Sequence, residues 1–229
     1  MLNPKNICIC ILFYGATPTH AELANKVLNP QMAALASSGC FFIFGCNAVG
    51  ADTCRTITAA RRGAYKNSIV VSSDDNIYKY PMMRKMLDSM PENIEMCIWF
   101  DHDSHLLTPD VDRWLTRLQG QLISNDVLGS VHKMPLSETE CEIAEKLWGE
   151  DVTMPAYVTS LNPSWWAASS VSEFRHHWPP AELGQKYGHV LFGEFIRRRN
   201  LRLAHFRDDV AVNVNGSGVE RTAPQDFLS

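Results

Sequence analysis

Apolar and polar positions follow one another in blocks along the first half of the chain. Four nearly continuous apolar runs of strand length lie at 7–14, 40–46, 67–73 and 95–101. Between them, apolar residues recur at helical spacing over 19–37, 52–62 and 81–90, and Pro30 favours a break in the first of these segments. Uninterrupted apolar strands are typical of a sheet covered on both faces, and their alternation with helices predicts parallel strands with right-handed crossovers.

The second half of the sequence is less regular. Thr108 and the helical spacing of the apolar residues after it predict a helix over 108–122. Further segments are a strand at 127–132, a helix at 137–148, an aromatic loop at 160–170, helices near 170–178 and 190–199, a strand at 201–206 and a poorly ordered polar tail at 213–226. The whole pattern predicts one α/β domain with a mostly parallel central sheet flanked by helices.

Composition and charge narrow the class of protein. A chain of 229 residues that is 45% hydrophobic can bury the core of a single domain, and a net charge of -4 gives no global reason to bind a polyanion. The seven cysteines form no Cys-x-x-Cys pair and mostly lie in apolar runs, which is typical of reduced core thiols in a cytoplasmic protein. The apolar run at 7–14 is too short to span a bilayer, so we expect an internal strand and no transmembrane segment.

Charged residues follow the fourth apolar run directly, in the order Asp101, His102, Asp103 and, two positions later, His105. Because side chains alternate along a strand, Asp101 and Asp103 are predicted to point to one side and His102 to the other. The carboxyl edge of a parallel sheet is where ligands bind, and two carboxylates held together there suit Mg²⁺ or Mn²⁺, which bridge carboxylates to phosphates. The alternative is a solvated turn in which Asp103 caps the next helix.

These residues carry a family resemblance. Asp101-His102-Asp103 resembles the Asp-x-Asp motif of GT-A fold glycosyltransferases, and 72–87 resembles the Asn-rich loop and Arg-bearing helix before that motif in family 2 of those enzymes. Residues 162–174 are similar to the acceptor-side segment of that family, and 192–206 to its acidic helix and following strand. The ordered series implies a GT-A (Rossmann-like) domain over 1–212, with a nucleotide-sugar-binding half at 1–107, an acceptor-binding half at 108–212 and a flexible tail at 213–229.

The resemblance also implies an activity, which is metal-dependent, inverting transfer of a sugar from a nucleoside-diphosphate donor to a hydroxyl group. It favours a UDP-sugar as donor and Mn²⁺ or Mg²⁺ as cofactor. It implies that the nucleoside is held by residues at the end of the first strand and in the Asn-rich loop, namely Tyr14, Gly15, Thr17, Asp74 and Asp75. Asp101 and Asp103 would hold the ribose and the metal, which would neutralise charge on the leaving diphosphate. His205 would complete the metal shell, although a core histidine is the alternative.

Other residues match the family at positions of known role. Arg84 would approach the diphosphate, unless it is a surface salt-bridge partner. Glu194 would deprotonate the acceptor, with Asp208 and Asp209 as fallback bases, but Phe195 stands where the family often has a second acid. The alternative for Glu194 is an ion pair with an arginine one turn further along the helix.

Trp165 and Trp166, placed on the predicted aromatic loop, suit a sugar or base platform, although at least one of them is expected in the core. The arginines at 197–199 are usually solvated in such a run, but they could grip the phosphates of an acceptor. The acceptor could therefore be a glycan or a hydroxymethylated base in DNA. Alternative functions are a metal-dependent phosphohydrolase or nucleotidyltransferase, which would use the same acidic cluster, and a non-catalytic nucleotide-sugar binding module.

Overall fold

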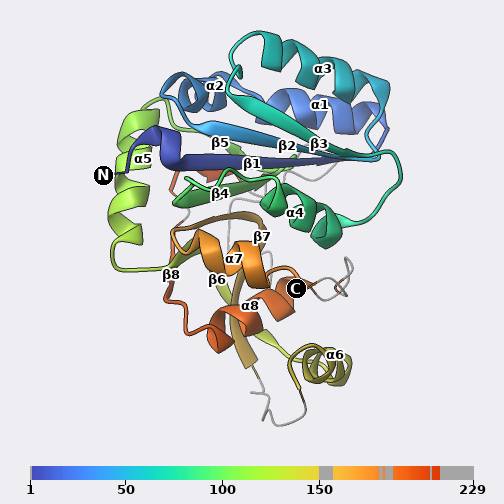
Figure 1. The fold of residues 1–229 in the computed structure, drawn as a ribbon, viewed down its shortest axis with the longest axis vertical. Coiled ribbons are helices and arrows are strands. Elements are labelled where there is room, and N and C mark those ends of the chain that lie inside the picture. The colour runs from blue at the N-terminus through green and yellow to red at the C-terminus, as the bar shows by residue number, and fades with distance from the viewer. Residues whose placement is uncertain (1, 150–156, 181–182, 184–187, 207, 212–229) are drawn as a thin grey trace.

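The computed structural model describes residues 2–149, 157–180, 183, 188–206 and 208–211, and its elements are arranged around one large sheet (Figure 1). The strands of this sheet are β1 (Ile7–Tyr14), β2 (Phe41–Asn47), β3 (Ser68–Ser73), β4 (Met96–Asp101), β6 (Val127–Pro135), β7 (Tyr157–Ala168) and β8 (Leu203–His205). The helices are α1 (Pro18–Val27), α2 (Pro30–Ser37), α3 (Ala51–Arg62), α4 (Lys79–Asp88), α5 (Val111–Leu122), α6 (Glu138–Trp148), α7 (Val171–His177) and α8 (Gly188–Arg198), after a short 3-10 turn at Pro4–Asn6.

The sheet has the strand order β3-β2-β1-β4-β7-β6-β8. Neighbouring strands are parallel at every pairing except the two that β7 makes, with β4 and with β6. Two short strands, β5 (His105–Leu106) and β9 (Val210–Ala211), form a separate antiparallel pair. The predicted α/β fold with a mostly parallel central sheet is therefore confirmed.

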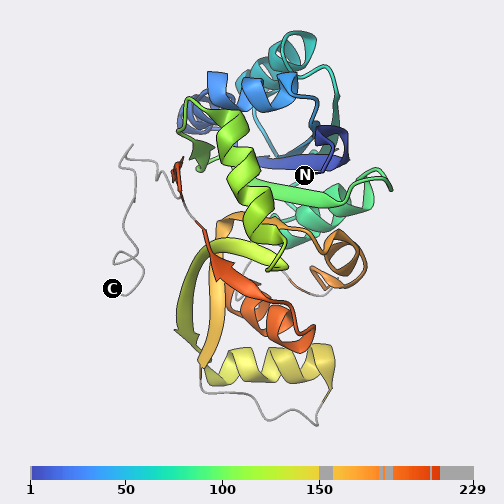
Figure 2. The same ribbon diagram turned by 90° about the vertical axis from the view of Figure 1, so that its left-hand side faces the viewer.

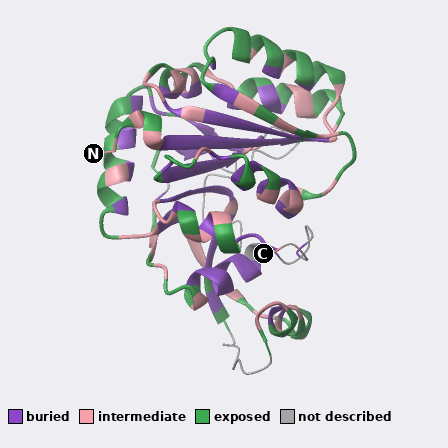
Figure 3. Ribbon diagram, viewed as in Figure 1, coloured by how far each residue is buried: buried purple, intermediate pink, exposed green. Residues whose placement is uncertain are grey.

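Both faces of the sheet are covered, as the continuous apolar runs predicted. Along β1, Ile9 and Ile11 pack into a core shared with α1, α2, α3 and α5, whereas Cys8 and Cys10 pack into a second core shared with α4, α7 and α8. Figure 1 shows α1, α2 and α3 above the strands and α4 below them. Figure 2, turned by 90°, shows α5 running in front of the strands. In Figure 3, β1, β2 and β4 are buried along almost their whole length. The edge strand β3 differs, since most of its residues are half-buried or exposed.

Helix boundaries follow the capping residues. The predicted break at Pro30 is confirmed, since α2 begins there and the Asn29 side chain accepts a hydrogen bond from the Met32 N–H at 2.9 Å. The predicted start of α5 was too early, because its cap is Asp110, which accepts from the Arg113 N–H at 3.1 Å. The longest helices in the described part of the chain have 12 residues, well short of the roughly 20 that a membrane-spanning helix needs.

The predicted aromatic loop at 160–170 was wrong, because β7 continues through Ala168. Pro163, which has no backbone N–H to donate, is tolerated because the β6–β7 register shifts between Gly129 and Val131, so β7 carries residues that are not paired with β6 at that point. Beyond the shift, Trp166 pairs with Trp99 of β4. The predicted polar tail at 213–226 lies outside the described residues.

An ion pair fastens the short edge strand β8 to the sheet. The Asp126 carboxylate accepts from the Arg202 backbone N–H at 2.8 Å and from its guanidinium at 3.0 Å and 3.2 Å. These hydrogen bonds lower the pKa of Asp126, although the Arg202 side chain is 60% exposed and solvent weakens the pair.

Asp126→Asn is therefore expected to lower the free energy of unfolding by about 1 kcal/mol at pH 7. Because the pKa of Asp126 is lower in the folded chain, the stabilisation is complete above the unfolded-state pKa and is lost as pH falls through the folded-state value. Denaturant melts of both proteins from pH 7 to pH 2.5 should converge at the acid end. If the difference in unfolding free energy between the two proteins did not change with pH, the effect would come from packing and not from the charge of Asp126.

Candidate functional site

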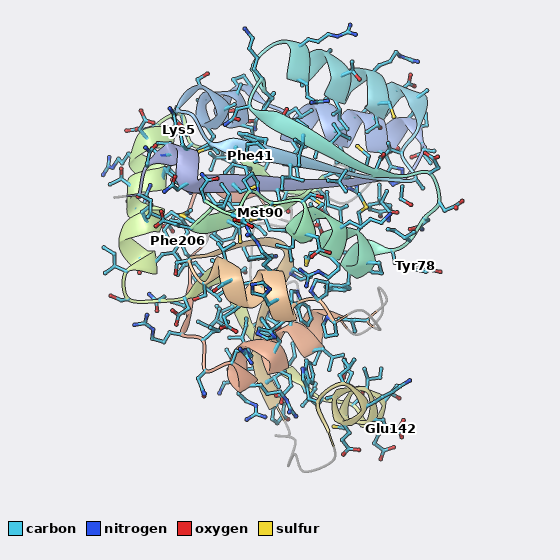
Figure 4. All side chains as sticks on the ribbon, in the orientation of Figure 1. Lys5, Phe41, Tyr78, Met90, Glu142 and Phe206 are labelled. Atoms are coloured by element: carbon cyan, nitrogen blue, oxygen red, sulfur yellow. The ribbon has the colours of Figure 1, made fainter. Side chains whose placement is uncertain are left out.

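A cavity of about 280 Å³ lies at the carboxyl edge of the parallel strands. Three of its walls are strand ends: Tyr14 ends β1, Asn47 ends β2 and Asp101 ends β4. Its described lining consists of Leu12, Tyr14, Asn47, Asn76, Tyr78, Lys79, Tyr80, Asp101, Asp103 and Pro163. Figure 4 labels Tyr78 near the end of the sheet at which β1 finishes. The cavity therefore occupies the position in which open α/β sheets bind their ligands.

Two carboxylates of unequal environment line this cavity. Asp101 accepts a hydrogen bond from Trp99 Nε1 at 2.8 Å through one oxygen and forms an ion pair with Lys79 through the other. Asp103 Oδ1 is buried and has no hydrogen-bond partner among the described residues. Burial, and then the charge of Asp101, raise the pKa of Asp103 to about 7. The pair thus holds more negative charge than its surroundings compensate, and a cation or a proton would relieve it.

β4 ends at Asp101, and His102 and Asp103 follow in a turn, so the predicted alternation along a strand does not extend to them. His102 is absent from the described lining of the cavity. Its ring lies 4.6 Å from the ring of Tyr14 and 5.6 Å from that of His20, measured between centroids. Burial lowers the pKa of His102 to about 4, so the imidazole is neutral at pH 7 and supplies no positive charge. Of this ring cluster, Tyr14 belongs to the described lining of the cavity, and His102 stands behind it as a neutral ring.

Gly15 and Thr17 shape the loop after β1 and are absent from the described lining of the cavity. Gly15 has φ +83°, and a Cβ there would lie 2.4 Å from the ring of His20, so only glycine permits this packing. The Thr17 side chain caps α1 and accepts from the backbone N–H of His20, whose own side chain reaches back to the Thr17 N–H. Gly15 and Thr17 were predicted to hold a nucleoside. In the structure they contact His20, whose ring lies against those of Tyr14 and His102.

Two asparagines that the sequence analysis did not single out stand beside the acids. Asn47 is 3% exposed, donates to Asn76 Oδ1 at 3.0 Å and accepts from the Ile77 N–H at 3.0 Å. These bonds hold the loop that leads to Tyr78, whose φ of +67° is a strained value for a residue with a side chain. The available signal was the position of Asn47, a polar residue closing an apolar strand at the ligand-binding edge.

The two aspartates predicted in the Asn-rich loop are not in this lining. Asp74 lines a different cavity, beside α3 and the edge strand β3, and Asp75 is exposed with its backbone carbonyl accepting from Ser73 Oγ at 2.9 Å. The residues of this segment that line the acidic pair's cavity are Asn76, Tyr78, Lys79 and Tyr80.

Arg84 is held away from the cavity by the end of α7. Its guanidinium donates to the carbonyl of Trp178 at 3.0 Å and to that of Arg175, and it pairs with Asp88 at 3.0 Å. The carbonyls at a helix carboxyl end carry partial negative charge, which attracts a cation. The contacts of Arg84 therefore match the alternative, a salt-bridge partner. Its approach to a diphosphate stays a prediction, because Arg84 is absent from the described lining of the cavity.

Trp165 and Trp166 are both fully buried, with 0% exposure. The Trp166 ring stacks on Trp99 at 5.9 Å and on Phe174 at 4.8 Å. The prediction of a ligand platform on a loop was therefore wrong about the loop, and the indoles lie in the core because β7 runs between β4 and β6.

His205 and Asp208 lie together in a separate cavity with Arg117. His205 Nδ1 accepts from the Val131 N–H at 3.2 Å, while Asp208 is ion-paired with Arg117. Asp209 lies 3.8 Å from the same guanidinium. His205 was expected to join Asp101 and Asp103 around a metal, and within the described ranges no three His, Cys, Asp or Glu side chains come together in that way.

Glu194 is also absent from the described lining of the cavity. It is fully buried, and its carboxylate accepts from Arg197 at 2.6 Å and 2.7 Å and from Arg198. Both carboxylate oxygens are therefore engaged by arginines of the same helix. The ion-pair alternative for Glu194 is the arrangement in the structure, and its catalytic role stays a prediction.

Glu194→Gln tests both readings of this residue. Removal of the buried charge between two arginines is expected to lower the free energy of unfolding by about 3 kcal/mol, since it leaves Arg197 and Arg198 without their shared partner. Thermal melts measure this loss. A variant that melts like the wild type but no longer supports sugar transfer would instead restore the role of base.

Comparison with protein-family models and with curated protein sequences finds no match. Solved structures do match in fold. A mannosyltransferase from Pyrobaculum calidifontis in complex with GDP-Man and Mn²⁺ superposes with a TM-score of 0.59 at 10% identity, over 90% of this chain and 56% of that one. S. aureus TarS 1-349 in complex with UDP gives 0.54 at 13% identity, over 88% of this chain and 58% of that one.

A third match is a protein assigned as a glucose-1-phosphate thymidylyltransferase from Bacillus anthracis, with a TM-score of 0.53 at 9% identity, over 90% of this chain and 89% of that one. At these identities the comparisons establish the fold alone, a Rossmann-like α/β fold that glycosyltransferases and nucleotidyltransferases share. This chain spans little more than half the length of the mannosyltransferase and TarS chains.

Proposed function

We propose that this protein is a glycosyltransferase that takes its sugar from a nucleoside-diphosphate donor, with a UDP-sugar as the first candidate. The observation that carries the proposal is the acidic pair at the carboxyl end of β4, where Asp103 Oδ1 is buried without a partner on the wall of a cavity. On a fold shared with nucleotide-sugar enzymes, a carboxylate with one unpaired buried oxygen at this edge suits a cation that carries phosphates.

The donor's nucleoside would lie in the half of the chain at 1–107. Tyr14 is 46% exposed at the cavity and offers a ring face, and Tyr78 is 53% exposed at the same cavity. Asn47 and Asn76 have amide groups that can bond to a base or ribose. We therefore propose these four residues as the nucleoside site, in place of Asp74 and Asp75.

The residues at the cavity fit a divalent cation in part. Asp103 supplies an oxygen without a partner, and Asp101 supplies a second carboxylate beside it. His205 belongs to another cavity, so the remaining ligands would be phosphate oxygens and water, as is usual for Mg²⁺ and Mn²⁺. Such an ion, when bound, would stabilise the charge that develops on the departing diphosphate.

In the proposed reaction the acceptor hydroxyl oxygen attacks the anomeric carbon of the sugar while the bond to the diphosphate oxygen breaks on the opposite face. A carboxylate takes the hydroxyl proton. The ring cluster of Tyr14, His20 and the neutral His102 would limit water at one side of the cavity. A glycan and a hydroxymethylated base in DNA remain the acceptor classes to test.

A nucleotidyltransferase is the second candidate, because the thymidylyltransferase match covers nearly the whole of both chains. One feature favours the glycosyltransferase. Free backbone N–H groups at a helix N-terminus are a common site for the phosphates of a nucleoside triphosphate. Here the loop after β1 closes α1 with a capping box and places Pro18, which has no N–H, in its first turn.

The two candidates release different products. The protein would be incubated with UDP-, GDP- and CMP-sugars and Mn²⁺ or Mg²⁺, and separately with nucleoside triphosphates and sugar 1-phosphates. Release of nucleoside diphosphate supports the proposal, and release of pyrophosphate supports the nucleotidyltransferase. Inorganic phosphate would indicate a phosphohydrolase, and a raised melting temperature without turnover would indicate a binding module.

A further inference from the structure

Lys79 is the positively charged side chain in the described lining of the cavity. It is the first residue of α4, and its side chain and that of Asp101 are each only 14% exposed. Its ammonium group forms an ion pair with Asp101 Oδ2 and donates to the Pro163 carbonyl at 2.9 Å. A lysine held in this way is a part of the site, since its charge lies between β4 and β7 and is mostly screened from solvent.

The position of Lys79 is fixed by structure on both sides. Tyr78, before it, adopts the strained φ of +67°, and Asn76 Oδ1 accepts from the Tyr78 N–H at 2.9 Å, which holds the turn. The carbonyl that binds the ammonium comes from Pro163, in the stretch of β7 where the register with β6 shifts. Strain of this kind gathers at binding sites, where the surrounding contacts impose it.

An ammonium group has three N–H donors, and the two described contacts of Lys79 use two of them. The third can meet a ligand in the cavity without the loss of either contact. An anionic ligand there would face two acids, so it needs a cation of the protein as well as any metal ion.

We propose that Lys79 is a donor-binding residue whose ammonium group pairs with Asp101 in the free protein and with the phosphates of the nucleoside diphosphate in the complex. The inference rests on the proposed function and extends it. Transfer of the ammonium from carboxylate to phosphate frees Asp101 for a divalent ion, so Lys79 and the metal compete for Asp101 in the free protein and act together on the diphosphate.

Lys79→Met tests this exchange, because methionine keeps an unbranched side chain of nearly the same length and removes the charge. Binding of UDP, GDP, uridine, guanosine and Mn²⁺ alone would be measured by calorimetry. We expect the affinity for the diphosphates to fall about 10- to 100-fold and that for the nucleosides to stay within about twofold. Mn²⁺ alone should bind about fivefold more tightly, because Asp101 has lost its competing partner.

Lys85→Met is the matched control, since Lys85 is an exposed lysine on the same helix and its loss changes the net charge equally. It should leave all five affinities unchanged. If the role of Lys79 were purely structural, its loss would lower the affinities for nucleosides and for diphosphates together and would not raise the affinity for Mn²⁺.

The outcomes separate the two proposals. If the wild type binds a diphosphate and Lys79→Met binds it equally well, the role of Lys79 is overturned and the proposed function stands. If the wild type binds neither UDP nor GDP, both are overturned. Should the variant fail to fold, acetylation of Lys79 in the wild type gives the answer by mass spectrometry: protection by UDP and none by uridine supports the proposal, and no protection by either overturns it.

Discussion

Asp103→Asn is expected to abolish metal-dependent turnover of the donor while the protein remains folded. Asp103 Oδ1 is the buried carboxylate oxygen of the cavity that has no partner among the described residues, so it is the group best able to bind an incoming cation. An amide keeps the shape of the side chain but binds Mg²⁺ or Mn²⁺ poorly. Release of nucleoside diphosphate should fall by about 100-fold or more, as follows from the loss of a group that stabilises charge in the transition state.

The same variant has a second expected effect, on stability. Burial raises the pKa of Asp103 to about 7 in the folded protein, against about 3.9 in an unfolded chain. The folded state therefore holds the proton more strongly, and stability falls as pH rises from about 4 to about 7, where the buried carboxyl ionises. In chelator, Asp103→Asn should melt close to the wild type at pH 4 and at a higher temperature at pH 8.

Glu92→Gln is the control for both measurements. Glu92 is an exposed carboxyl in the turn before β4, at the opposite end of that strand from the cavity, and its neutralisation changes the net charge by the same amount. It should change neither turnover nor the pH dependence of melting. If Asp103→Asn kept its turnover, the acidic pair would not bind the catalytic cation, and the solvated turn would be the better account of these residues.

The sequence predicts those residues of the site that are placed by a strand end, and it does not predict those that are placed by contacts between distant parts of the chain. Tyr14, Asp101 and Asp103 could be placed at one edge because each closes an apolar strand or follows one, and parallel strands bring their carboxyl ends together. Lys79 and Asn76 gave no such signal. They reach the cavity through a strained turn and through hydrogen bonds to residues 22 and 29 positions away, and no local pattern encodes these.

The residues that were matched by order along the chain fared differently. Arg84, Glu194 and Asp208 have side chains of the expected type and stand in the expected order along the chain. Each nevertheless makes its main contacts outside the cavity: Arg84 with the end of α7, Glu194 with two arginines of α8, and Asp208 with Arg117. Resemblance in order fixes which element a residue occupies. It does not fix which face of that element turns to the site, because packing between elements decides that.

Trp166 gives the largest expected effect on stability. Its indole is fully buried and stacks on Trp99 and Phe174, with Phe192 at its edge at 5.5 Å between centroids. Trp166→Ala removes these contacts and leaves a cavity that the sheet cannot close, so the free energy of unfolding should fall by about 3–5 kcal/mol. Denaturant unfolding followed by far-UV circular dichroism measures the loss.

Trp166→Phe separates packing from ligand binding. Phenylalanine keeps a stacked ring and removes an indole N–H that has no partner among the described residues, so it should recover about half of the lost stability or more. A residue of the core changes stability in proportion to the volume removed and leaves the nucleotide affinity of the folded fraction unaltered. A ligand platform would do the reverse, with a weaker UDP affinity in the phenylalanine variant at nearly unchanged stability, and that result would mean that β7 opens to bring this ring to the cavity.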